Sequence, residues 1–186
     1  MKPENILSIE KWTEIEKEIN NKFGLNASVF DADGIRITGF KNWANRFCPV
    51  IKSDKNGQNL ICAVAHQNIA LQARKTKKAV IGECDAGLLK LTVPIFVVGE
   101  FLGVVGGCGL LTDDSEVQTY LISKTIGLNE KLIEKLSYDI NRIDSDKVKL
   151  IVDKIQERVD KVVEGFCVQP EDFTIKRLLL DPSIGV

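Results

Sequence analysis

The sequence has little histidine, little net charge and no long uncharged apolar run. Its 186 residues contain one histidine, and 25 basic side chains nearly balance 26 acidic ones, for a net charge of −1. Because the basic residues are interspersed, no positive stripe indicates a nucleic-acid partner. No window approaches the roughly 18 uncharged apolar residues that span a bilayer. We therefore expect a cytoplasmic protein that binds neither nucleic acid nor membrane directly.

Catalytic motifs are also missing. The chain has no G-x-S-x-G or H-E-x-x-H sequence and no nucleotide-binding motif, and a single histidine gives a triad or a zinc hydrolase no anchor. Asp31 and Asp33 are a candidate carboxylate pair, but a hairpin turn at Asp33 and Gly34 explains them more simply. The sequence therefore predicts a protein that is not an enzyme.

Hydrophobic periodicity predicts helices at both ends of the chain and strands between them. Apolar residues at three- and four-residue steps predict a helix that follows Ser8 and ends before Gly24. A β-hairpin is expected within residues 26–40, a short and a longer helix within 46–79, and three successive strands within 79–112. Helical patterns return after residue 113, and residues 145–166 carry a coiled-coil-like seam of Val148, Val152, Ile155, Val159, Val162 and Phe166.

This order predicts an α+β fold with a five-stranded antiparallel sheet flanked by helices, the layout of PAS and GAF sensor modules, with additional C-terminal helices. Long apolar strands indicate burial on more than one face. We expect a sensory domain over residues 1–140. Residues 141–186 then form a helix and tail that dimerise, signal or pack on the same domain, and the tail either docks or stays mobile.

The most core-like segment, from Gly82 to Leu111, carries six glycines after its start and two cysteines. Glycine weakens a strand, so it persists where a bulge or the close approach of another group requires it. The missing side chains leave room either for a closely packed helix or for a small ligand above the sheet. Both interpretations stand, and Gly107 and Cys108 are candidates for a pocket wall.

Two stretches resemble a known family. They are "FCPVIKSDKNGQNLIC" and "ECDAGLLKLTVPIFVVGEFLGVVGGCGLL", and they resemble the PocR sensory-domain family over about Ile6 to Leu111. The resemblance implies a PAS-like module of bacterial transcription regulators, histidine kinases and cyclic-nucleotide signalling proteins, with small hydrocarbon derivatives as ligands. The chain has Asp85 and Cys108 where the family often has histidine and glutamine, which bears on the class of ligand.

The cysteines allow a second function. Cys62 and His66 lie four residues apart on one face of an expected helix, and with Cys48 and Cys84 they would offer three thiolates and an imidazole to zinc or iron. The chain has no C-x-x-C pair, so the spacing gives little support. Buried cysteines that pack as small hydrophobic side chains, with His66 as an ordinary helix residue, explain the pattern more simply.

We therefore expect a small-ligand sensor of signal transduction or transcription regulation, with the ligand between the sheet and the helical region of residues 48–71 and no required cofactor. Trp43 and Phe47 either cover this pocket or anchor a loop. The expected partners are the organic ligand, a downstream signalling protein or domain, and a second copy of the chain through the seam, for which intramolecular packing is slightly favoured. A Cys/His metal-binding or redox-sensing protein is the alternative. The expected ligand-binding residues are Trp43, Phe47, Cys48, Cys62, Cys84, Gly107 and Cys108.

Overall fold

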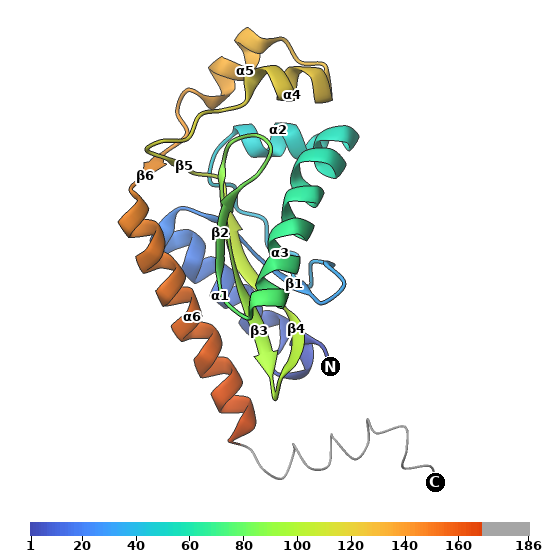
Figure 1. Cartoon of the computed structure of the whole chain (residues 1–186), viewed down its shortest axis with the longest axis vertical. Helices are drawn as coiled ribbons and strands as arrows, with labels where there is room; N and C mark the ends of the chain where they lie inside the picture. Colours follow the sequence, from blue (N-terminus) through green and yellow to red (C-terminus); the bar gives the residue numbers. More distant parts are fainter. Residues whose placement is uncertain (169–186) are drawn as a thin grey trace.

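The computed structural model describes residues 1–168 as an α+β fold, with helices on both faces of an antiparallel sheet (Figure 1). The expected tail beyond residue 168 lies outside the described residues. The described elements are η1 (Pro3–Asn5), α1 (Ile9–Phe23), β1 (Asn26–Asp31), α2 (Phe47–Ser53), the π-helix η2 (Gly57–Ala63), α3 (Val64–Thr76), β2 (Val80–Glu83), β3 (Leu89–Val97), β4 (Glu100–Cys108), β5 (Leu111–Thr112), α4 (Thr119–Ile126), α5 (Glu130–Ser137), β6 (Arg142–Ile143) and α6 (Ser145–Cys167).

The first helix forms where local signals predict it. The Ser8 side chain accepts a hydrogen bond from the backbone N–H of Lys11, and Gly24 ends the helix in the left-handed conformation with a φ of 68°. Glycine adopts this conformation without the strain that a Cβ atom would cause. The helix buries Trp12, Ile15 and Ile19 against the sheet, as their spacing predicts.

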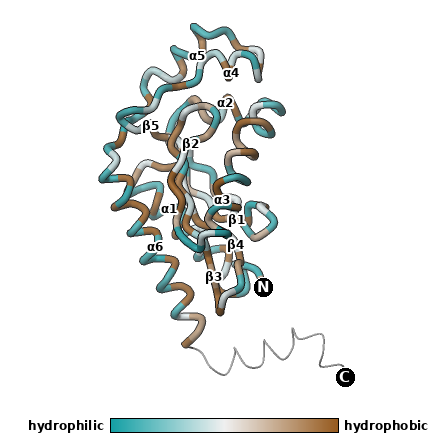
Figure 2. The backbone as a smooth tube through the Cα atoms, viewed as in Figure 1, coloured by the Kyte–Doolittle hydropathy of each residue, from teal (hydrophilic) through white to brown (hydrophobic). Residues whose placement is uncertain are grey.

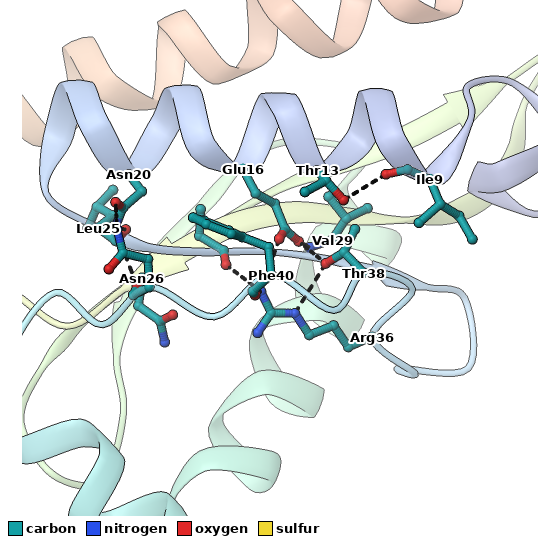
Figure 3. Close-up of polar contacts among 12 residues, drawn as sticks. Ile9, Thr13, Glu16, Asn20, Leu25, Asn26, Val29, Arg36, Thr38 and Phe40 are labelled. Atoms are coloured by element: carbon teal, nitrogen blue, oxygen red, sulfur yellow. Dashed lines mark hydrogen bonds and ion pairs between the residues drawn. The ribbon is translucent and has the colours of Figure 1, made fainter.

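The main sheet has four strands in the order β1-β4-β3-β2, so the prediction of five strands is wrong. A hairpin begins after Asp31, with Ile37 N–H donating to Val29 O, but it makes only one isolated bridge within the described chain. Side chains then occupy the outer edge of β1: Glu16 accepts from Val29 N–H at 2.7 Å, and Arg36 donates to the carbonyl of Ala27 at 2.9 Å (Figure 3). These bonds replace those of a fifth strand.

Side chains of β3 alternate between two covered faces of the sheet. Odd-numbered residues from Leu89 to Val97 join one core with α1 and α6, and the even-numbered Thr92 is buried on the opposite face, which α3 covers. Figure 2 shows β3 and β4 as a hydrophobic centre between helices of mixed character. Two covered faces explain why these strands read as continuous apolar runs.

The seam of α6 lies inside this core. Val148, Val152, Ile155, Val159 and Val162 are buried, and the helix packs along β3 (Figure 1). The apolar stripe expected as a candidate dimer seam is therefore used within the chain. Within residues 1–168, none of the helices combines the length and apolar character that a membrane crossing requires.

Candidate functional site

A cavity of about 440 Å³ lies between the sheet and the covering helices α2, η2 and α3. The sheet side of its wall is formed by Asn26, Ser28, Phe30, Lys90 and Cys108. The helical side is formed chiefly by Cys48, Ile51, Lys52, Ile61, Cys62 and His66. The volume lies within the range of about 300–1,000 Å³ for small-molecule sites.

Strand register places three polar side chains in one row on the cavity wall. Asn26 of β1 lies opposite Cys108 of β4, which in turn lies opposite Lys90 of β3. Because side chains alternate between the two faces of a strand, these directly paired residues point to the same side of the sheet. The Asn26 side-chain amide also donates to the Cys108 sulfur at 3.7 Å.

The covering helices are held by local polar contacts. The side-chain oxygen of Asn45 accepts from the backbone N–H groups of Phe47 and Cys48, which fixes the start of α2. The next turns form a π-helix from Gly57 to Ala63 that leads directly into α3. Short π-helical segments occur frequently at functional sites, and this one contributes Ile61 and Cys62 to the wall.

Two buried polar atoms of the wall have no hydrogen-bond partner within residues 1–168. They are Oδ1 of Asn26 and Nε2 of His66, in residues that are only 3% and 7% exposed. A buried polar atom without a partner costs about 1–3 kcal/mol, so such atoms are uncommon unless a ligand or water meets them. They provide two points for a polar ligand.

Burial keeps the imidazole of His66 and the thiols of Cys48, Cys62 and Cys84 uncharged in the cavity wall. It lowers the pKa of His66 to about 3, with the positive charges of Lys90 and Lys52 acting in the same direction. It raises the pKa of Cys62 to about 11 and also raises those of Cys48 and Cys84. Neutral thiols are weak nucleophiles and weak metal ligands.

The geometry gives no support to the zinc or iron alternative. Among the described residues, no three His, Cys, Asp or Glu side chains are grouped so that they can hold a metal ion, although Cys48, Cys62, His66 and Cys84 all line the cavity. Within the same residues all five cysteines are free. Four of them serve as parts of one largely apolar wall, and Cys167 is exposed at the end of α6.

The sequence-predicted ligand residues separate into two groups. Trp43, Cys48, Cys62, Cys84 and Cys108 line the cavity.

Phe47 and Gly107 do not line it. Phe47 is fully buried in a second core with Ile122 of α4 and Ile133 of α5. Gly107 faces the other side of the sheet, where a Cβ atom would lie 2.9 Å from the Cβ of Leu25. This glycine therefore allows the close approach of Leu25, and we leave both residues out of the candidate site.

Sequence reasoning missed the polar residues of the sheet wall. Lys90 is the single charge in the apolar run "LLKLTVPIFVV", and Asn26 begins a strand of alternating character. An isolated charge in a buried strand is a usable signal, because a charge rarely lies there without a partner. His66 was considered as a metal ligand or as an ordinary helix residue, and not as part of the organic-ligand pocket.

The chain matches one family of known proteins. A family model described as the sensory domain found in PocR matches residues 5–165. This range extends past the sequence resemblance, which ends near Leu111, and includes α4, α5 and nearly all of α6. No curated protein and no solved structure matches the chain.

Proposed function

The chain belongs to the PocR sensory-domain family, and from that premise we propose that it binds a small organic molecule in the cavity between the sheet and α2, η2 and α3. One observation carries this proposal: Asn26 Oδ1 and His66 Nε2 are buried in the wall of this cavity and find no hydrogen-bond partner in the part of the chain that the structure describes. A ligand with a polar group would meet both atoms, while the apolar part of the wall would receive its hydrocarbon body.

We propose a sensing role without catalysis. Catalysis by acid and base requires groups that change protonation near the working pH. The pKa of His66 lies well below that range and the pKa of Cys62 well above it. His66 and Cys62 are therefore better suited to recognising a ligand than to catalysis.

Ligand binding would act on the elements that cover the cavity. The helices α2 and η2 contact α5 and α4 respectively, and Gly57 of η2 lies close to Ile126 of α4. The α4–α5 pair lies beyond α2 and leads through β6 into α6 (Figure 1). A ligand that fits one position of α2 and η2 better than another would shift these helices, which a downstream signalling or transcription-regulating partner would detect. We place this role in the cytoplasm, where free cysteines persist.

A cavity-filling variant tests the proposal. Ser28 lies on the cavity wall beside Gly106, its partner on β4, so Ser28→Phe would place a ring in the empty volume. The matched control is Ile81→Phe on β2, outside the lining. The probe is a panel of small carboxylic acids, their neutral amides and alcohols of the same size, screened by thermal shift.

We expect at least one compound of the panel to raise the melting temperature of the native protein and of Ile81→Phe, and to leave Ser28→Phe unchanged. Stabilisation that survives in Ser28→Phe would contradict this site. Absence of stabilisation by every compound would overturn the proposed function.

A further inference from the structure

Formal charge in the cavity wall has one sign. Within residues 1–168 the wall contains Arg36, Lys41, Lys52 and Lys90 and no aspartate or glutamate. Charge of one sign around a concave, low-dielectric site attracts ligands of the opposite sign. These four charges differ in whether the described part of the protein supplies them with a counter-charge.

Two of the four are accounted for. Arg36 forms an ion pair with Glu16 at 3.1 Å, and Lys41 is exposed to solvent. The ammonium group of Lys52 lies 5.5 Å from the ring centroid of Trp43. This cation–π contact attracts the ammonium group but supplies no negative charge. The backbone of Lys90 pairs within the sheet, but its ammonium group forms no hydrogen bond and no ion pair with any residue of the described part of the chain.

Lys90 lies where an unpaired charge is costly. It occupies the central strand β3 between the fully buried Leu89 and Leu91, and its own side chain is half-buried on the cavity face. Lys90 and Lys52 both act on the pKa of His66, so both ammonium groups lie within electrostatic reach of the same wall. A half-buried charge is stabilised when an opposite charge enters its site.

We propose that the ligand of this cavity is a small organic anion. Its carboxylate pairs with Lys90 and Lys52, and a hydroxyl or amide group on the same molecule reaches Asn26 Oδ1 and His66 Nε2. The hydrocarbon body lies against Phe30 and Ile61 of the wall. This inference rests on the proposed function, because it names the class of molecule that the same cavity takes.

The test compares each carboxylic acid with its own amide, because the two differ in charge but hardly in shape. The pairs are 3-hydroxybutyrate and 3-hydroxybutyramide, mandelate and mandelamide, and benzoate and benzamide, at equal ionic strength, with inorganic phosphate as an anion that has no hydrocarbon body. Binding is measured by thermal shift and calorimetry on the native protein, Lys90→Gln and Lys90→Met. The matched control is Lys55→Gln, which removes the same charge from an exposed residue outside the lining.

We expect at least one acid to bind more tightly than its amide, and Lys90→Gln and Lys90→Met to weaken that acid about tenfold or more, as the loss of a charged hydrogen bond predicts. Lys55→Gln would leave its affinity within about twofold, because an exposed charge is screened. Amides that bind as well as their acids, phosphate that binds equally well, or an acid preference that persists in Lys90→Gln would overturn the inference. Amides or alcohols that bind in place of acids, with binding abolished in Ser28→Phe, would leave the proposed function standing. A panel without any binder would overturn both.

Discussion

The ring of Phe30 on β1 lies against the imidazole of His66 on α3, with ring centroids 3.7 Å apart and an angle of 32° between the planes. This contact joins the sheet to its covering helix at the edge of the cavity, since both residues line it. Aromatic pairs of this kind add about 0.5–1.5 kcal/mol beyond the area that they bury. The contact fixes the imidazole, while its Nε2 atom has no hydrogen-bond partner among the described residues.

His66 makes the protein less stable in mild acid. Its pKa is about 3 in the folded chain, below the ordinary value of 6.5, so the unfolded chain binds the proton first. Stability is therefore fully present above pH 6.5 and falls as the pH decreases towards 3. Between pH 6.5 and pH 5 the loss from this residue is about 2 kcal/mol. Urea unfolding of the native protein and His66→Gln at pH 7 and pH 5 measures it, and an equal pH dependence in both would contradict it.

Glu16 is the buried charge on which the edge of β1 depends. It is fully buried, accepts from Val29 N–H and from Thr38 at 2.5 Å, and pairs with Arg36 (Figure 3). Glu16→Ala would leave the backbone N–H of Val29 without its partner and the half-buried guanidinium of Arg36 without its counter-charge, so we expect a loss of about 3–5 kcal/mol in the free energy of unfolding.

The control for this change is Glu18→Ala on the same helix, which breaks exposed ion pairs to Lys22 of α1 and to Arg158 of α6. Exposed pairs contribute about 0–1 kcal/mol, so this variant should remain close to the native protein in urea unfolding. Equal losses of unfolding free energy in the two variants would show that the burial of Glu16 does not determine how much it stabilises the fold.

Gly107 and Gly165 should respond oppositely to replacement by alanine. At Gly107 the new Cβ atom would overlap Leu25, so Gly107→Ala is expected to cost about 1–3 kcal/mol. Gly165 lies in α6 with nothing within 4 Å of its Cβ position, so Gly165→Ala should stabilise by about 0.5–1 kcal/mol. Thermal unfolding measures both changes in stability. A Gly107→Ala variant as stable as the native protein would mean that Leu25 moves aside.

The thiols should differ sharply in reactivity. Cys62, with a pKa of about 11, carries a thiolate fraction at pH 7.5 that is more than about a hundredfold below that of an ordinary thiol. Cys167 is exposed. Timed alkylation with iodoacetamide should therefore modify one cysteine rapidly, and Cys167→Ser should remove that fast phase. Rapid modification of Cys48, Cys62 or Cys84 in the native protein would contradict the burial of these thiols in the cavity wall.

Local signals in the sequence predicted the elements whose causes are local. Ser8 and Gly24 bound α1, and a long apolar run marked β3 as a strand buried on both faces. The missing fifth strand was not predictable in this way, because Glu16 and Arg36 are twenty residues apart and only the folded chain brings them to the edge of β1. Because these two side chains bond the backbone groups at the outer edge of β1, the β-branched residues that follow Asp31 have no free strand edge with which to pair.

The cavity likewise combines residues that the sequence predicted with residues that only the folded chain brings together. We expected Cys48, Cys62, Cys84 and Cys108 among the ligand-binding residues, and all four line the cavity. Strand register separates Gly107 from Cys108, which are neighbours in the sequence but point to opposite faces of the sheet. Lys90 was overlooked because its alignment with Asn26 through Cys108 depends on the pairing of β4 with β1, a strand that lies far from β3 and β4 in the sequence.

Binding of a small organic anion in this cavity is tested most directly by an NMR titration. The ¹⁵N-labelled native protein is titrated with the acids of the panel, and the signals of the Asn26 side-chain amide and the His66 ring nitrogens are observed. If the acid binds in the cavity, we expect it to shift both sets of signals together, along with the backbone signals of Lys90 and Cys62. Shifts confined to residues outside the cavity, or the absence of any shift at Asn26 and His66 with every acid, would contradict it.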